Sequence, residues 1–208
     1  MRTRAHAAAL CIALSLPAPC PAHGTDWVEQ PLYEMGALYL ADALSNVHGG
    51  LREGSAWVDY LELAAGFDAG RALGIGRAVV PFLELEGRKK VLDVGGGPGT
   101  YSVLIAAAHP KVECVVVDLP EVVAISDELI AAAGLAGRVR TLAGDYRSLP
   151  FPCANDAVLF FGVLHQEGPE AIRDLLKRAH EALAPGGVVY ILDMMTDVTR
   201  TKPKFSAL

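Results

Sequence analysis

Hydrophobic positions follow two different patterns along this chain, and the pattern changes near residue 87. In residues 25–86 they recur with helical spacing, interrupted by glycine-containing turns. Beyond residue 87, short β-branched runs alternate with longer amphipathic segments. We expect strands over residues 90–94, 112–117, 139–143, 157–161 and 188–192, and helices over residues 100–109, 120–133 and 169–184.

Strands that alternate with helices are typical of a parallel sheet with right-handed crossovers. The expected strands are apolar throughout, as they are when helices cover both faces of a sheet. We therefore predict an α/β fold, a Rossmann-like doubly wound parallel sheet preceded by helices. The buried sheet also explains the mean hydropathy of +0.32. Outside residues 1–24 no apolar run approaches the roughly 20 residues of a membrane-spanning helix.

The composition excludes several classes of protein. The 208 residues are 52% hydrophobic and 20% charged, which favours a globular chain over a disordered one. A net charge of −6, with no Lys/Arg cluster beyond residues 88–90, argues against a nucleic-acid partner. Cys114 and Cys153 lie far apart and no Cys/His cluster has zinc spacing, so we expect reduced thiols and no metal site.

Residues 1–24 form a leader with two interpretations. Arg2 and Arg4 precede an Ala/Leu-rich stretch, which prolines and small residues follow. This is the outline of a secretory signal peptide. The alternative is a disordered extension of a protein that stays in the cytoplasm.

The loop after the first expected strand, residues 93–99 (DVGGGPG), points to a class of cofactor. Glycines let a ligand approach the main chain, and the first amides of the next helix face anionic groups. In a dinucleotide fingerprint starting at Gly95 the third glycine would fall on Thr100. Asp93 would repel a pyrophosphate but could hold an ammonium group, directly or through water. A ligand with an amino-acid tail therefore suits this loop better than NAD.

Carboxylates also follow the next two expected strands. Asp118 is placed to accept hydrogen bonds from ribose hydroxyls, and Asp145 to reach an adenine edge. In open parallel sheets, ligands bind at the carboxyl ends of the strands. Each Asp alone could simply form a cap or turn, but three at successive strand ends favour a binding role.

Five motifs follow one another along the chain: residues 93–99, DLP at 118–120, GDY at 144–146, VLH at 163–165 and PGG at 185–187. Together they resemble the ordered motifs of the class I S-adenosylmethionine-dependent methyltransferases. More narrowly, they are similar to the small-molecule O-methyltransferases that include plant phenolic and hydroxyindole enzymes. The resemblance implies strand order 3-2-1-4-5 and a methyltransferase domain over residues 87–208, with the later strands missing and the chain short at both ends.

The resemblance also implies roles for individual residues. His165 occupies the position of the family's general base, and Asp193 that of the acidic residue that orients it, one methylene shorter than the usual Glu. The chain departs from the pattern at residues 166–167 (QE, where Asp-Trp is common) and at Phe161, where a polar residue is frequent. The implied S-adenosyl-L-methionine contacts are Asp93, Gly95, Gly97, Gly99, Asp118, Leu119, Asp145 and Tyr146.

The implied function is methyl transfer from S-adenosyl-L-methionine to a hydroxyl of a small, aromatic acceptor. One alternative is a fragment that binds the cofactor without turnover, and the other is an NAD-dependent oxidoreductase, which Thr100 and Asp93 disfavour. We expect no nucleic-acid or membrane partner. The family implies a homodimer, weakened here by the short N-terminal region, and a cytoplasmic location, since the cofactor is made and kept there.

Overall fold

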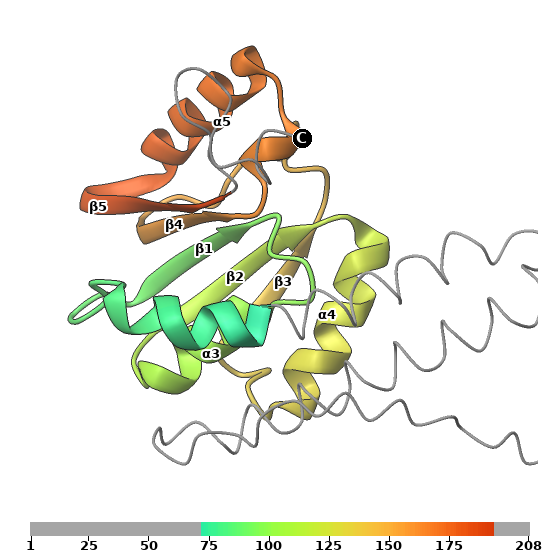
Figure 1. The fold of residues 1–208 in the computed structure, drawn as a ribbon, viewed down its shortest axis with the longest axis vertical. Helices are drawn as coiled ribbons and strands as arrows, with labels where there is room; N and C mark the ends of the chain where they lie inside the picture. The colour runs from blue at the N-terminus through green and yellow to red at the C-terminus, as the bar shows by residue number, and fades with distance from the viewer. Residues whose placement is uncertain (1–71, 194–208) are drawn as a thin grey trace, which may run out of the picture.

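A five-stranded parallel sheet forms the centre of the computed structural model, which describes residues 72–193. The strand order is β3-β2-β1-β4-β5, and all four neighbouring pairs are parallel. The predicted α/β fold and strand order are therefore confirmed (Figure 1). The strands are β1 (Lys90–Val94), β2 (Glu113–Asp118), β3 (Val139–Ala143), β4 (Asn155–Phe161) and β5 (Leu183–Leu192).

Helices cover both faces of this sheet. Three cross over between strands: α3 (Thr100–Ala108), α4 (Pro120–Ala132) and α5 (Pro169–Ala182). Residues 72–79 are helical and lead into the 3₁₀ turn η1 (Val80–Phe82), and a second 3₁₀ turn, η2 (Leu164–Gln166), follows β4. Two of the crossover helices begin with a proline, whose fixed φ suits the first helical position.

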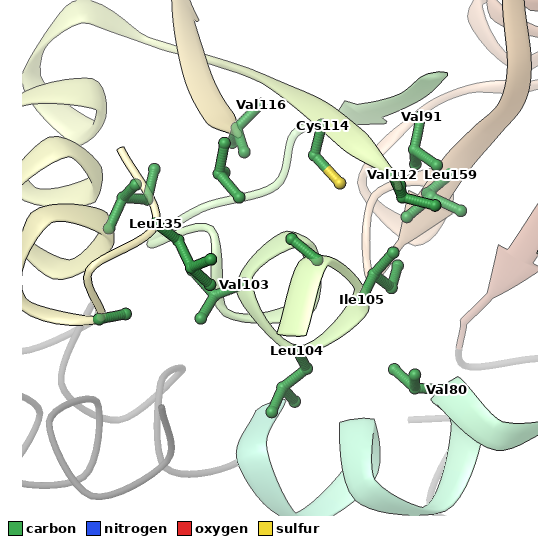
Figure 2. Packing of buried hydrophobic residues seen from close by; sticks show 14 of the residues in the cluster. Val80, Val91, Val103, Leu104, Ile105, Val112, Cys114, Val116, Leu135 and Leu159 are labelled. Atoms are coloured by element: carbon green, nitrogen blue, oxygen red, sulfur yellow. The ribbon is translucent and has the colours of Figure 1, made fainter. Parts of the chain in front are cut away.

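Each face of the sheet carries its own hydrophobic core. Val91 of β1 packs with α3 and α4, and Figure 2 shows Val103, Leu104 and Ile105 of α3 within this cluster. Leu92, the next residue of β1, packs on the opposite face with α5. This alternation follows from the two-residue period of a strand, and burial on both faces explains the apolar strands.

The strand register brings the loops that follow the strands to one edge of the sheet. Val94 pairs with Val117, and Asp118 pairs with Ala143, at the ends of β1, β2 and β3. β4 and β5 end in register as well. Val94 and Leu192, 98 positions apart in the sequence, therefore lie at the same carboxyl edge.

The main difference from the predicted boundaries lies at β5. We predicted a helix to residue 184 and a strand from residue 188, whereas α5 ends at Ala182 and β5 begins at once. An irregularity opposite Asn155 absorbs the residues between Leu183 and Val188, so the strand is longer than its apolar run. The leader, residues 1–24, and most of the predicted segment 25–86 lie outside the described residues. Within residues 72–193 no helix has the length and apolar character needed to cross a membrane.

Candidate active site

The floor of the site is the glycine loop between β1 and α3. Asp93, the fourth residue of β1, is fully buried beneath this loop and accepts a hydrogen bond from Ser102 Oγ at 2.7 Å. Burial raises the pKa of the Asp93 carboxyl to about 6; the bond from Ser102 opposes the rise, and the charge of Asp118 adds to it. Among the described residues, Asp93 Oδ1 and Thr100 Oγ1 are buried without a hydrogen-bond partner.

The glycine loop is fixed in place from the neighbouring βα unit. Asp118 Oδ2, at the end of β2, accepts a hydrogen bond from Gly97 N at 2.8 Å, and its Oδ1 accepts one from Leu119 N. Ser126 Oγ of α4 lies 2.6 Å from the Gly97 carbonyl oxygen. Gly97 is thus held at both its N–H and its C=O. Burial raises the pKa of Asp118, and the two backbone bonds oppose that rise.

Gly95 and Gly97 both have positive φ, but the space around them differs. A Cβ on Gly95 (φ +65°) would lie 2.7 Å from Val163 Cγ2, a distance that side chains do not tolerate. A Cβ on Gly97 (φ +55°) would meet nothing within 4 Å. Gly95 is therefore required by packing against the loop after β4, whereas Gly97 borders open space. Gly99, also at positive φ, is the N-cap of α3.

The loop after β3 carries the third predicted carboxylate. Asp145 Oδ1 accepts a hydrogen bond from Arg147 N at 2.9 Å, which is the turn-forming role that its residue type also allows. Tyr146, the next residue, donates its hydroxyl to Glu167 Oε1 at 2.7 Å. The Tyr146 side chain thus connects the loop after β3 to the segment that follows β4.

The loops after β4 and β5 bring together the predicted general base and the acidic residue predicted to orient it. His165 Nδ1 lies 2.7 Å from Asp193 Oδ1, and His165 N donates to Asp193 Oδ2 at 3.1 Å. The Asp193 side chain is 2% exposed and that of His165 is 32% exposed. The shorter Asp side chain therefore reaches the imidazole, and the ring keeps an open side toward solvent.

All the predicted site residues lie in the loops at the carboxyl edge or in the strand residues that lead into them. Leu119, the N-cap of α4, is 40% exposed there, beside Asp118. Sequence reasoning missed Ser102, Ser126 and Glu167. A serine within an apolar helical stripe was the available signal for Ser126, which is fully buried on α4.

Comparison with known proteins identifies the family. A model of the O-methyltransferase domain matches residues 63–208. The chain belongs to this O-methyltransferase family. Over 132 residues it is 37% identical to 3-hydroxy-5-methyl-1-naphthoate 3-O-methyltransferase of Streptomyces sahachiroi, a match that covers 64% of this chain and 38% of that protein. Over 119 residues it is 40% identical to the N,N-dimethyltransferase OxyT of Streptomyces rimosus, covering 57% of this chain and 34% of that protein.

A solved methyltransferase structure agrees with these matches. The S-adenosylmethionine-dependent methyltransferase SibL, in its apo form, superposes with a TM-score of 0.61 at 28% identity, covering 86% of this chain and 58% of that chain. The chain spans about a third of the length of the curated relatives described above. The family membership and this neighbour indicate S-adenosyl-L-methionine as the cofactor.

The residues at the carboxyl edge fit this cofactor. Gly97 borders space that a side chain would fill, and Asp118 presents a carboxylate beside it whose oxygens each retain a lone pair. The unpartnered Oδ1 of Asp93 beneath the loop suits a cation rather than a phosphate. These hydrogen-bond acceptors therefore match a ligand with an ammonium group and ribose hydroxyls.

Proposed function

We propose that this O-methyltransferase family member transfers a methyl group from S-adenosyl-L-methionine to a hydroxyl of a small aromatic compound. The observation that supports the proposal most strongly is that two arrangements lie at the same edge of the sheet. A glycine loop braced by Asp118 lies there together with a histidine braced by Asp193. The first arrangement suits the cofactor and the second suits a hydroxyl acceptor.

Cofactor binding in this proposal uses three loops. The main chain of residues 95–99 would hold the amino-acid tail, and Asp93 would counter its ammonium charge. Asp118 would accept hydrogen bonds from the ribose hydroxyls, beside the exposed Leu119. Asp145 and Tyr146 would bind the adenine. S-adenosyl-L-methionine, when bound, supplies a methyl group on a positively charged sulfur, so the electrophile needs no further activation.

His165 is the proposed general base. Because its Nδ1 faces a carboxylate, the proton of the neutral imidazole belongs on Nδ1 and the lone pair on Nε2. Nε2 takes the proton of the acceptor hydroxyl as the oxygen forms its bond to the methyl carbon. The bound cofactor would supply the methyl group, and its sulfur would keep the electron pair of the broken carbon–sulfur bond. Asp193 stabilises the imidazolium that results.

The acceptor class rests on the relatives. The Streptomyces sahachiroi protein is named for transfer to a hydroxyl of a naphthoate, and we extend an aromatic hydroxyl acceptor to this chain. A homodimer and a cytoplasmic location stay predictions, the second because this cofactor is made and kept in the cytoplasm.

The test is transfer of labelled methyl from S-adenosylmethionine to a panel of phenols by the full chain. His165→Ala should lower the rate by about 100-fold, in the range that general-base catalysis supplies. His180→Ala is the matched control, because His180 is an exposed histidine of α5. Transfer that His165→Ala leaves unchanged would remove His165 as the base. Cofactor binding without any transfer would leave a binding protein instead.

A further inference from the structure

Glu167, just beyond η2, is a buried carboxylate between the loops after β3 and β4. Its side chain is 6% exposed, although it lies only three residues before Glu170, whose side chain is 89% exposed. Glu167 Oε1 accepts hydrogen bonds from Tyr146 Oη at 2.7 Å and from Arg147 Nε at 2.9 Å. These bonds, the one from Arg147 first, lower the pKa of Glu167, so the group is charged at neutral pH.

Tyr146 extends this contact to the glycine loop. Its Cε1 lies 3.5 Å from where a Cβ of Gly95 would stand, and Val163 Cγ2 lies 2.7 Å from the same point. Val163 lies two residues before His165. The Tyr146 ring therefore lies beside the loop that follows β1, while its hydroxyl is held by the segment that carries His165.

The backbone of the β3 loop has a separate anchor. The Arg178 guanidinium of α5 donates to the carbonyl oxygens of Arg147 and Leu149 and lies over the Phe151 ring, 4.3 Å from its centroid. The loop thus does not need Glu167 to hold its path. What Glu167 fixes is the side chain of Tyr146 and, with an Nη2 contact of 2.8 Å, that of Arg147.

We propose that Glu167 is a positioning residue of the cofactor site, which holds the Tyr146 ring against the glycine loop in the geometry that binds the adenosine part of the cofactor. This inference rests on the proposed function. The hydrogen bond from Tyr146 to Glu167 therefore shapes this part of the site.

The experiment measures the dissociation constant for S-adenosylhomocysteine by calorimetry with the full chain. We expect Glu167→Ala and Tyr146→Phe each to weaken binding about tenfold, which corresponds to about 1.4 kcal/mol. The double variant should bind S-adenosylhomocysteine as tightly as the single variant with the lower affinity, because both changes break the same contact. Glu167→Gln keeps an acceptor for the Tyr146 hydroxyl and should lose only about threefold. Glu170→Ala is the matched control and should bind as the wild type does.

Several outcomes would overturn the inference. Unchanged affinity in Glu167→Ala and Glu167→Gln, or losses that simply add in the double variant, would leave Glu167 with a purely structural role. Wild-type protein that fails to bind would instead overturn the proposed function. Hydrogen exchange of the ligand-free chain tests the geometry apart from binding. The amides of Arg147, Ser148 and Leu149 should exchange at the wild-type rate in Glu167→Ala, because Arg178 holds this backbone, and faster exchange would show that Glu167 holds the loop itself rather than the Tyr146 side chain.

Discussion

Asp193 contacts His165 through both of its carboxylate oxygens, one at the backbone N–H and one at the imidazole Nδ1. The two residues are 28 positions apart and lie at the ends of neighbouring strands. Such a double contact restrains both the position of the residue and the rotation of its ring. It also leaves Nε2 as the ring nitrogen that can accept a proton.

Asp193→Asn should therefore lower kcat for methyl transfer by about 100-fold, because an amide can accept at only one of its two positions and no longer stabilises an imidazolium. The dissociation constant for S-adenosylhomocysteine should stay at the wild-type value, since Asp193 acts on the acceptor side. Steady-state rates and calorimetry measure the two effects. The control is Glu181→Gln, which also removes a carboxylate charge, from an exposed side chain of α5. Equal kcat for Asp193→Asn and wild type would contradict the assignment.

Gly97 and Gly87 form a matched pair for testing the space in front of the glycine loop. Both have positive φ, and a Cβ on either would meet nothing within 4 Å. Alanine at each position should cost about 1 kcal/mol of stability through backbone strain. Only Gly97→Ala should also weaken S-adenosylhomocysteine binding, by at least about tenfold, because its methyl group enters the proposed cofactor space. Equal dissociation constants for the two variants would place the cofactor elsewhere.

Asp93 predicts a pH dependence of stability with a definite sign. Its pKa rises from 3.8 to about 6 on folding, so the folded state binds more protons than the unfolded state between these values. The contribution of Asp93 to the free energy of unfolding therefore falls as pH rises through this window, by an upper bound of about 3 kcal/mol.

Asp93→Asn cannot titrate and should lack this fall. Urea unfolding of the two proteins between about pH 4 and pH 7 should show the variant gaining stability relative to wild type as pH rises. A difference in unfolding free energy that stays constant over this range would contradict the raised pKa. Burial, and next the charge of Asp93, raises the pKa of the Cys114 thiol to about 12, so this thiol stays neutral between about pH 4 and pH 7.

The sequence was sufficient to predict most of the sheet because its strands are short and rich in β-branched or aromatic residues, and glycine or aspartate follows the apolar run of β2, β3 and β4. The bounds of β1 and β3 were predicted to the residue. Those of β5 were not, because Asn155 and its irregular pairing, rather than local propensity, draw residues from Leu183 onward into the sheet.

The candidate site was predictable only in part for a similar reason. Parallel strands in register bring their carboxyl ends together, so placing Asp118 and His165 at one edge required only the strand order. The contact of Tyr146 with Glu167 depends on the conformations of two irregular loops, which no periodic pattern encodes. Ser102 was missed because a small polar side chain within an apolar helix indicates a hydrogen-bond partner, but the sequence does not say which residue that partner is.

We propose above that S-adenosyl-L-methionine binds at the carboxyl edge beside Asp118. A calorimetric titration of the full chain with S-adenosylhomocysteine tests this, alongside Asp118→Ala and the control Asp127→Ala. Asp127 is an exposed carboxylate of α4 that accepts a hydrogen bond from Thr141. We predict saturable one-to-one binding by wild type and Asp127→Ala, and at least about tenfold weaker binding by Asp118→Ala. No saturable binding by wild type, or equal binding by Asp118→Ala, would contradict the account.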